Sequence, residues 1–264
     1  MQALERSAGA RLLIRTKDGV APTEAGKVAY RHAKLLARQL DRARVEVRSL
    51  ATVPVGRVTV GMAPHSHARR LIQPLLKIAA EQYPEILLHI SENFEGLLAD
   101  DLRLGRMDMA LLYETVARPG FRSEHVSTEA LEVVGHSSLL GAPSPDPTGA
   151  LPMLLPSAAH AIRHLVEAIY SSHRIRPRIV AEIESYETLA AAVAEGLGVT
   201  VLPHSMAIEF ARAHGLTSRP FGAKPTFITL VLSTVQDHAP SEAARVIHVL
   251  LARLAAEAGA ELVS

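Results

Sequence analysis

The longest regular pattern of hydrophobic and polar positions runs from Thr23 to Leu50. Apolar residues recur there at alternating intervals of four and three, and most positions between them are charged or polar. Thr23 offers a capping hydroxyl, and Pro54 ends the pattern because proline lacks the N–H that a helical hydrogen bond needs. The spacing predicts one helix with a narrow apolar seam, formed by Ala29, Ala33, Leu36, Leu40, Ala43, Val47 and Leu50.

This seam has two interpretations. At 1.5 Å per residue the helix would be roughly 42 Å long, too long to lie along a small domain. A narrow stripe on so long a helix favours pairing with the same helix of a second copy, so we expect a homodimer that can pair further into a tetramer. The alternative is a solvated helix that lies on its own chain.

Downstream of Gly56 the pattern alternates between short strands and amphipathic helices. Expected strands are 57–62, 86–90, 108–112, 131–134, 151–155, 178–183, 196–203 with its leading turn, and 226–232. Expected helices are 67–82, 97–105, 156–170, 185–195 and 242–254, with a crossover at 113–131 and a loop at 141–149. Strands that alternate with helices predict an α/β fold with a parallel sheet covered on both faces.

Composition narrows the class of protein. The 264 residues are 48% hydrophobic and 21% charged, enough to bury a sizeable core. No apolar run approaches the ~20 residues of a membrane span, and the N-terminus lacks a signal-peptide layout, so we expect a cytoplasmic protein. The absence of cysteine excludes a disulfide scaffold, a thiolate zinc site and a cysteine nucleophile.

The net charge of +1 hides an asymmetry along the chain. Residues 1–50 hold 11 Lys and Arg against 5 Asp and Glu, whereas the remainder holds 17 against 22. A basic head on an acidic body suggests that the head meets a polyanion such as DNA. The alternative is a solvated helix face that is simply rich in arginine.

Near the N-terminus, Gly9 is a plausible helix C-cap and Asp18-Gly19 a hairpin turn. The segment LERSAGARLLIRTKDGVAPTEAG resembles the end of the winged helix-turn-helix in LysR-type transcriptional regulators. Residue types, order and spacing agree over 23 positions, at Leu4-Glu5, Gly9, Leu12-Leu13, Arg15-Thr16, Lys17 to Val20 and Thr23-Glu24-Ala25-Gly26. The family's first two helices and the base-reading part of its recognition helix would lie before Met1, so the resemblance implies that most of the DNA-reading head is missing from this chain.

The body is similar to the effector-binding domain of the same family, which shares its fold with periplasmic binding proteins. The segments PLLKIAAEQYPEILLHISE, LRLGRMDMALLY and VAEGLGVTVLP carry this resemblance, and their wording is closest to the branch that regulates nitrogen and sulfur assimilation. The resemblance implies a helix-turn-helix remnant at 1–22, a linker and dimerisation helix at 23–50 and an effector-binding domain at 56–264. Lobe I would cover about 56–131 plus 233–264, and lobe II about 132–232.

Small polar residues stand where several expected strands turn into helices. In doubly wound sheets, ligands bind at the carboxyl ends of the strands, where helix N-termini favour a small anion. The resemblance implies that these turns contact the effector. We therefore expect an effector site at His65, Ser66, His67, Asn93, Ser157 and Ser185, closed on one wall by Pro203 and His204. The alternative is that these residues only cap their helices.

Other chemistries find weak support. His65 and His67 form a single pair without further ligand spacing, so we expect no metal site. Gly196 and Gly198 are too few for a dinucleotide fingerprint, and the sequence contains no nucleophile elbow and no phosphate-binding loop. We expect neither an enzyme nor a cofactor.

Together these features predict a LysR-type regulator controlled by a small anionic effector held between two lobes. Arg6, Arg11, Arg15 and Lys17 remain to neutralise DNA phosphates, which predicts weak binding that is indifferent to base sequence. The alternative is a ligand-binding or dimerisation protein without sequence-specific DNA binding. A periplasmic solute receptor is disfavoured, because no signal segment is present and the basic helix would have no role.

Overall fold

The computed structural model describes residues 1–17, 19–33, 36, 40, 54–114, 119–141, 151–222, 224–236 and 239–261. The head comprises helix α1 (Gln2–Ala8) and an antiparallel hairpin of β1 (Leu13–Thr16) and β2 (Gly19–Pro22). Gly9 ends α1 with a left-handed φ of 65°, as predicted for a C-cap glycine. Residues 24–33 are helical, and the Thr23 hydroxyl accepts the Gly26 N–H at 2.9 Å, which confirms the predicted N-cap.

Glycine is required where this helix meets the hairpin. A Cβ at Gly26 would lie 1.9 Å from the carbonyl oxygen of Leu12, and that same oxygen accepts the Thr23 N–H at 2.9 Å. The start of the helix and the hairpin therefore pack as one unit. Of the predicted seam, Ala29, Ala33, Leu36 and Leu40 are helical, with both leucines exposed in the single chain, whereas Ala43, Val47 and Leu50 lie outside the described residues.

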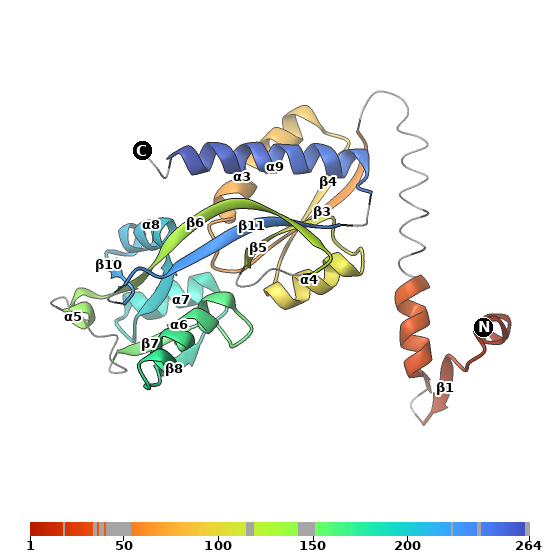
Figure 1. The fold of residues 1–264 in the computed structure, drawn as a ribbon, viewed down its shortest axis with the longest axis horizontal. Coiled ribbons are helices and arrows are strands. Elements are labelled where there is room, and N and C mark those ends of the chain that lie inside the picture. Colours follow the sequence, from red (N-terminus) through yellow and green to blue (C-terminus); the bar gives the residue numbers. More distant parts are fainter. Residues whose placement is uncertain are drawn as a thin grey trace.

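The body is built on a sheet with the strand order β10–β6–β11–β5–β3–β4, in which β9 also pairs with β6. Its strands are β3 (Gly56–Met62), β4 (Ile86–Glu92), β5 (Met109–Glu114), β6 (Phe121–Gly135), β9 (Thr200–Pro203), β10 (Thr217–Pro220) and β11 (Phe227–Val235). β6 and β11 run side by side along the whole body (Figure 1). Two long paired strands, β6 and β11, therefore link the two ends of the body.

The two long strands correct the sequence prediction. Residues 113–131 are not a crossover, because a single strand runs from Phe121 to Gly135, and the expected strand at 131–134 is only its end. The first half of β6 carries charged side chains such as Arg122 and Glu124, which obscure the alternation. The sheet is also mixed: β3 pairs in parallel with β4 and β5, but β11 pairs antiparallel with both β5 and β6.

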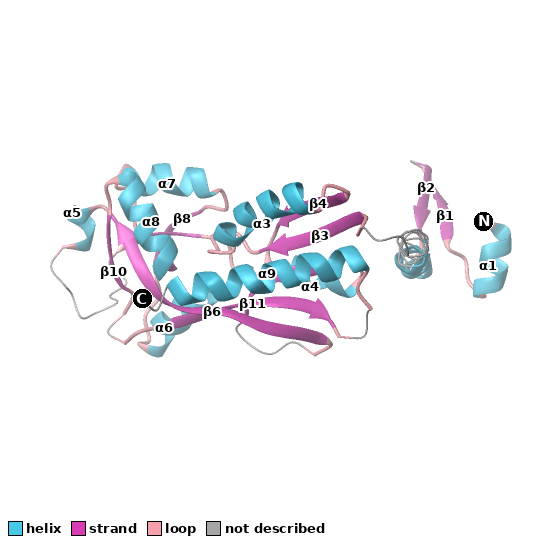
Figure 2. Cartoon of the chain, turned by 90° about the horizontal axis from the view of Figure 1, so that it is seen from above, coloured by secondary structure: helices cyan, strands magenta, loops and turns pink. Residues whose placement is uncertain are grey.

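Helices cover both faces of the first lobe, by which we mean β3, β4, β5 and the helices packed on them. On one face α3 (Arg69–Gln82) and α9 (Glu242–Glu261) lie beside each other, as Figure 2 shows from above. Their apolar stripes, including Leu71, Leu75 and Ile247, are buried over β3. On the other face α4 (Glu95–Arg103) packs Leu98 and Leu102 against β5.

The second lobe consists of β7 to β10 and the helices α5 to α8. β7 (Pro152–Leu155) and β8 (Arg178–Glu182) pair in parallel, and a bridge between Met153 and Val199 joins them to β9. The helices are α5 (Ser137–Leu140), α6 (Ala161–Ser172), α7 (Tyr186–Ala194) and α8 (His204–His214). The predicted α/β, two-lobed architecture is confirmed.

Two helix starts differ from the prediction, and one further helix is not predicted. α3 begins at Arg69 rather than His67, and α6 begins at Ala161, because His160 rather than Ser157 caps it. Helix α8 is not among the predicted elements, although Gly215 at its end is a typical stop signal. In the part of the chain that the structure describes, no helix is both long and apolar enough to span a lipid bilayer.

Candidate functional site

The turn after β3, residues 63–68, connects the two lobes. His65 has a left-handed φ of 50°, and its Nε2–H donates to the carbonyl oxygen of Glu184 in the second lobe at 2.9 Å. In return His160, the N-cap of α6, donates its Nε2–H to the carbonyl oxygen of Pro64 at 2.8 Å. These two hydrogen bonds join the lobes at the carboxyl end of β3.

Both histidines are buried and uncharged at neutral pH. Burial lowers the pKa of His65 to about 4, and burial likewise lowers the pKa of His160. The Nδ1 atom of His160 accepts the Ile162 N–H at 3.1 Å, whereas Nδ1 of His65 is buried without a hydrogen-bond partner. Because Nε2 of His65 carries the proton, its Nδ1 is a buried acceptor to which no described residue donates a hydrogen bond.

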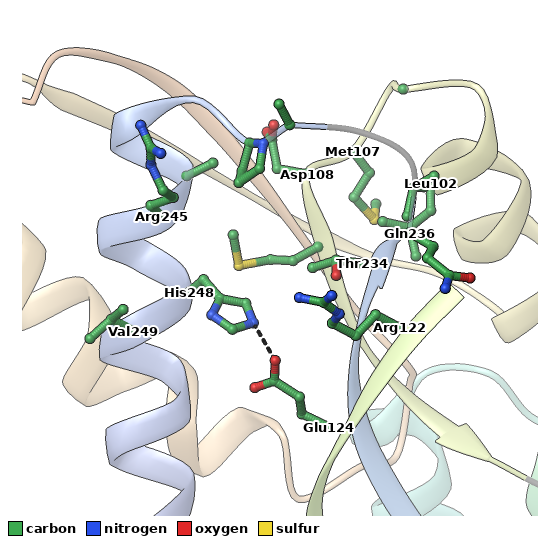
Figure 3. Close-up of a pocket in the computed structure, with 16 residues that line it drawn as sticks. Leu102, Met107, Asp108, Arg122, Glu124, Thr234, Gln236, Arg245, His248 and Val249 are labelled. Atoms are coloured by element: carbon green, nitrogen blue, oxygen red, sulfur yellow. Dashed lines mark ion pairs between the residues drawn. The ribbon is translucent and has the colours of Figure 1, made fainter. Parts of the chain in front are cut away.

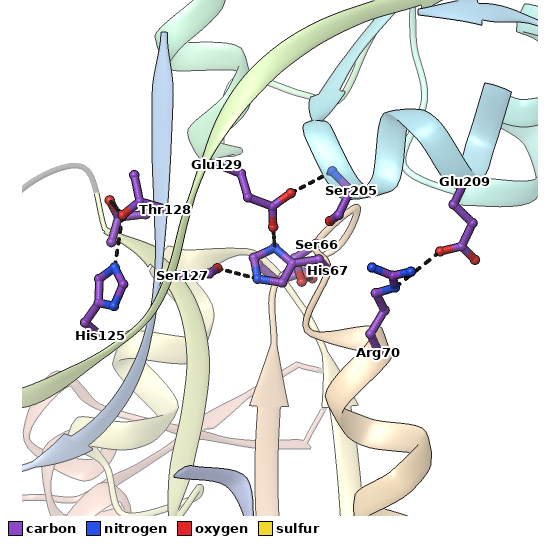
Figure 4. A network of polar contacts seen from close by, with 11 residues as sticks. Ser66, His67, Arg70, His125, Ser127, Thr128, Glu129, Ser205 and Glu209 are labelled. Atoms are coloured by element: carbon purple, nitrogen blue, oxygen red, sulfur yellow. Dashed lines mark hydrogen bonds and ion pairs between the residues drawn. The ribbon is translucent and has the colours of Figure 1, made fainter. Parts of the chain in front are cut away.

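A buried contact between a histidine and a carboxylate lies beside this turn (Figure 4). His67 Nδ1 stands 2.8 Å from Glu129 Oε1, and its Nε2 stands 2.5 Å from Ser127 Oγ. The other carboxylate oxygen of Glu129 accepts the Ser205 N–H at the start of α8, at 2.7 Å. Glu129, on the long strand β6, therefore holds the first lobe's turn and the second lobe's helix together.

These contacts set the ionisation of Glu129. Burial by itself would raise its pKa, but the hydrogen bonds from His67 and Ser205 outweigh burial and lower the pKa to about 2. The carboxylate is thus charged throughout the physiological range. A negative group at the first turn of α8 also suits the positive end of the helix dipole.

The start of α3 extends the contact between the lobes. The guanidinium carbon of Arg69 lies 4.6 Å from the ring centroid of Tyr186, a cation–π distance, and Arg70 stands 3.7 Å from Glu209. Nearby, burial raises the pKa of Glu92, although the charge of Arg69 acts in the opposite direction. Arg69 is exposed, and it lies over Tyr186 of the second lobe.

The structure gathers most of the predicted effector residues around the His65 turn. Asn93 donates its N–H to Met62 at the end of β3, at 3.1 Å, and Ser157 donates its N–H to the Glu184 carboxylate at 3.0 Å. Ser185 immediately follows Glu184 and caps α7 through Thr188, at 3.2 Å. The turns and strand ends that hold His65, Ser66, His67, Asn93, Ser157 and Ser185 therefore meet between the lobes.

Three of the predicted side chains are engaged elsewhere. The Ser66 hydroxyl is fully buried and donates to the Ala63 carbonyl at 2.7 Å. Pro203 ends β9 and precedes α8, and His204 pairs with Glu132 on β6 rather than facing the turn. The capping interpretation thus describes Ser185, and Ser66 stabilises its own turn.

Three residues of the site, Glu129, His160 and Arg69, are not predicted from the sequence. Glu129 lies in the segment that the sequence predicts as a crossover, and a charged residue is ordinary in an exposed connection, so nothing marks it as part of a site. In the strand it is 5% exposed among apolar neighbours, and a buried charge signals a partner. His160 gives no local signal, because histidine is not among the preferred N-cap residues.

Two other predicted groups can be placed. Arg6, Arg11, Arg15 and Lys17 are all exposed on the head. Among the residues that the structure describes, no cluster of three or more His, Asp or Glu side chains is arranged to hold a metal ion.

Comparison with known proteins identifies the family. The sequence profile of the LysR substrate binding domain matches residues 51–256. The nitrogen assimilation regulatory protein Nac of Klebsiella aerogenes is 39% identical over 206 residues, which cover 77% of this chain and 67% of that protein. Its counterpart in Escherichia coli K12 is 37% identical, with the same coverage. Both relatives are named as nitrogen-assimilation regulators, in agreement with the branch that the sequence resembles.

Solved structures support the fold. A full-length OxyR variant from Pseudomonas aeruginosa superposes with a TM-score of 0.64 at 22% identity, covering 96% of this chain and 87% of that one. The effector binding domain of QuiR in complex with shikimate gives a TM-score of 0.63 at 16% identity, covering 77% and 98%. The relatives identified by sequence are transcriptional regulators, not enzymes. The chain therefore belongs to the LysR family of transcriptional regulators.

Proposed function

We propose that this LysR-type regulator is controlled by a small anionic effector bound between its lobes, at the turn that carries His65. The observation that supports it is the reciprocal pair of hydrogen bonds, His65 to Glu184 and His160 to Pro64. Arg69 supplies a cation beside Tyr186, and the N-termini of α6 and α7 begin at the residues that contact the His65 turn, which favours an anion. The QuiR domain, which shares the fold, was solved in complex with shikimate.

The effector would act by changing the angle between the lobes. The effector can shift the equilibrium between two arrangements of the lobes only by the difference between its affinities for them. A ligand that donates a hydrogen bond to Nδ1 of His65 and places its anion near Arg69 contacts both the first lobe's turn and its α3 helix. A ligand that also contacts Tyr186 or the start of α7 reaches both lobes, and so stabilises the arrangement in which Arg69 lies over Tyr186 and His65 bonds Glu184.

Removal of the cation at the cleft should weaken the effector. Small carboxylates and sulfur or nitrogen oxyanions are screened by thermal shift, and the affinity of the best ligand is measured by calorimetry. Arg69→Gln should weaken binding at least tenfold, because a hydrogen bond to a charged group contributes about 1.5–3 kcal/mol. Arg253→Gln, which removes an exposed arginine paired with Glu257 on α9, is the matched control and should bind as wild type. Unchanged affinity in Arg69→Gln would place the site elsewhere.

We further propose a homodimer formed by the predicted seam, with 23–50 as the linker, 1–22 as the remnant of a winged helix-turn-helix and 56–264 as the effector domain. Leu36 and Leu40 are 70% and 54% exposed in the single chain, which is costly for leucines without a partner surface. Leu36→Asp with Leu40→Asp should therefore lower the mass measured by light scattering from dimer toward monomer. A dimer that persists at micromolar concentration would exclude this seam, and Val28→Asp, off the seam on the same helix, is the control.

The remaining proposals follow from the family. The exposed Arg6, Arg11, Arg15 and Lys17 contact DNA phosphates, and the protein acts in the cytoplasm. The second candidate, a ligand-binding and dimerisation protein without sequence-specific DNA binding, is favoured by the head as described. Its one described helix before the linker, α1, has no buried residue and so has no helical partner to orient it in a groove.

A further inference from the structure

A cavity of about 270 Å³ lies in the first lobe, at the end of the sheet farthest from the second lobe (Figure 3). It is enclosed by the first turns of α9, the end of β11, the start of β6 and the connection from α4 to β5. None of these segments belongs to the cleft between the lobes. The cavity is near the lower end of the size range of small-molecule sites.

The inner wall is apolar and adaptable. Leu102, Met107, Met109 and Ala244 line it and are buried. Met107 and Met109 both line the cavity, and methionine gives a polarizable surface that adjusts to a ligand and makes favourable contacts with aromatic rings. The inner wall therefore suits a flat, apolar ring.

The outer wall is charged, and most of its charges are already paired. Glu124 stands 3.3 Å from His248, and Arg245 stands 2.6 Å from Glu242. Asp108 accepts the Thr59 N–H at 2.8 Å. These groups are held by the protein itself.

Arg122 differs from them. Its backbone pairs with Thr234 of β11, but among the described residues its guanidinium has neither an ion-pair nor a hydrogen-bond partner. The guanidinium points across the cavity toward His248 (Figure 3). A guanidinium presents two parallel N–H groups that match a carboxylate. Asp108 and Glu124 flank the cavity, so a ligand with a second negative charge would be repelled.

We propose that this cavity is a second ligand site, separate from the cleft, that binds a small aromatic monocarboxylate. The ring lies against Met107 and Met109, and the carboxylate pairs with Arg122. The chemistry excludes a phosphate, which would bring excess negative charge, and an organic cation, which Arg122 and Arg245 would repel. β6 begins at this site and β11 ends at it. A bound ligand therefore contacts β6, the strand that carries Glu129 at the contact between the lobes.

The test uses the full chain and phenylacetate, with the uncharged phenylacetamide as its isostere. Binding is followed by saturation-transfer NMR of the ligand and titrated to obtain Kd. Phenylacetate should bind saturably, and phenylacetamide at least tenfold more weakly. Arg122→Gln should raise the Kd of phenylacetate at least tenfold, whereas Arg253→Gln, an exposed arginine of α9 outside the cavity, should leave it unchanged.

One further variant separates this site from the cleft. Arg69→Gln, which removes the cation of the cleft, should leave phenylacetate binding intact. The proposal is overturned if no saturable binding occurs, if the amide binds as well as the acid, or if Arg69→Gln loses the ligand while Arg122→Gln retains it.

Discussion

Replacing Glu129 by alanine should destabilise the protein by roughly 2–6 kcal/mol, because it leaves two buried donors, the His67 ring N–H and the Ser205 N–H, without an acceptor at about 1–3 kcal/mol each. The carboxylate side chain is only 4% exposed and faces His67 at 2.8 Å. The same substitution removes the acceptor of the Ser205 N–H at the start of α8. Urea or thermal unfolding, followed by circular dichroism, measures the change.

A matched control lies on the same strand. The side chain of Glu124 is 43% exposed and stands 3.3 Å from His248, so this pair is screened by water. Glu124→Ala should therefore cost less than about 1 kcal/mol. If the two variants lose equal stability, the contact between the lobes does not depend on the buried pair.

The pH dependence gives a second readout for Glu129. Its pKa falls from an ordinary value of 4.5 to about 2 on folding, so its contribution is fully present above 4.5 and is lost as the pH drops from 4.5 toward 2. At about 1.4 kcal/mol per pKa unit, the loss amounts to roughly 3 kcal/mol. Glu129→Gln, which cannot titrate, should flatten the fall of Tm between about pH 5 and pH 3. A slope that matches wild type would show that other carboxylates control acid unfolding.

The elements that could be predicted from the sequence are those whose signals are local. Gly9, Thr23 and Ser185 act as caps where the pattern placed them, because a cap depends on a few neighbouring backbone groups. β6 could not be recognised in this way, since its first half is charged on the solvated side of an antiparallel pair. α8 is absent from the prediction for a different reason. Pro203 and His204, where it begins, are assigned from the sequence to a wall of the effector site and not to the start of a helix.

The site was predictable in outline and not in its contacts. Strand ends that turn into helices indicate the His65 turn, Asn93, Ser157 and Ser185. The partners that decide their roles lie far along the chain: Glu184 is 119 residues from His65, and Glu129 is 76 residues from Ser205. No local pattern states which carboxylate will face which histidine, because the register of β6 against β11 fixes the position of Glu129.

Binding to DNA is the property for which the family and the described head give different expectations. LysR regulators bind specific operators, but the described head offers one short helix without buried residues, a hairpin and four exposed cations. Phosphate contacts position a protein and do not distinguish bases. We therefore expect this chain to bind the promoter upstream of its own coding sequence no more tightly than a scrambled duplex.

The affinity should instead depend steeply on salt. If Arg6, Arg11, Arg15 and Lys17 each neutralise one phosphate, the logarithm of the binding constant falls with the logarithm of salt concentration with a slope of about −3.6, or roughly 100-fold between 50 and 200 mM. Fluorescence anisotropy with both duplexes measures this, and Arg15→Gln should reduce the slope by about one while Arg253→Gln leaves it unchanged. Fusion of a complete helix-turn-helix to the N-terminus of this chain should confer preference for the promoter. A strong preference by the chain alone at physiological salt would show that α1 and the hairpin read base sequence, and the proposed limitation to phosphate contacts would be wrong.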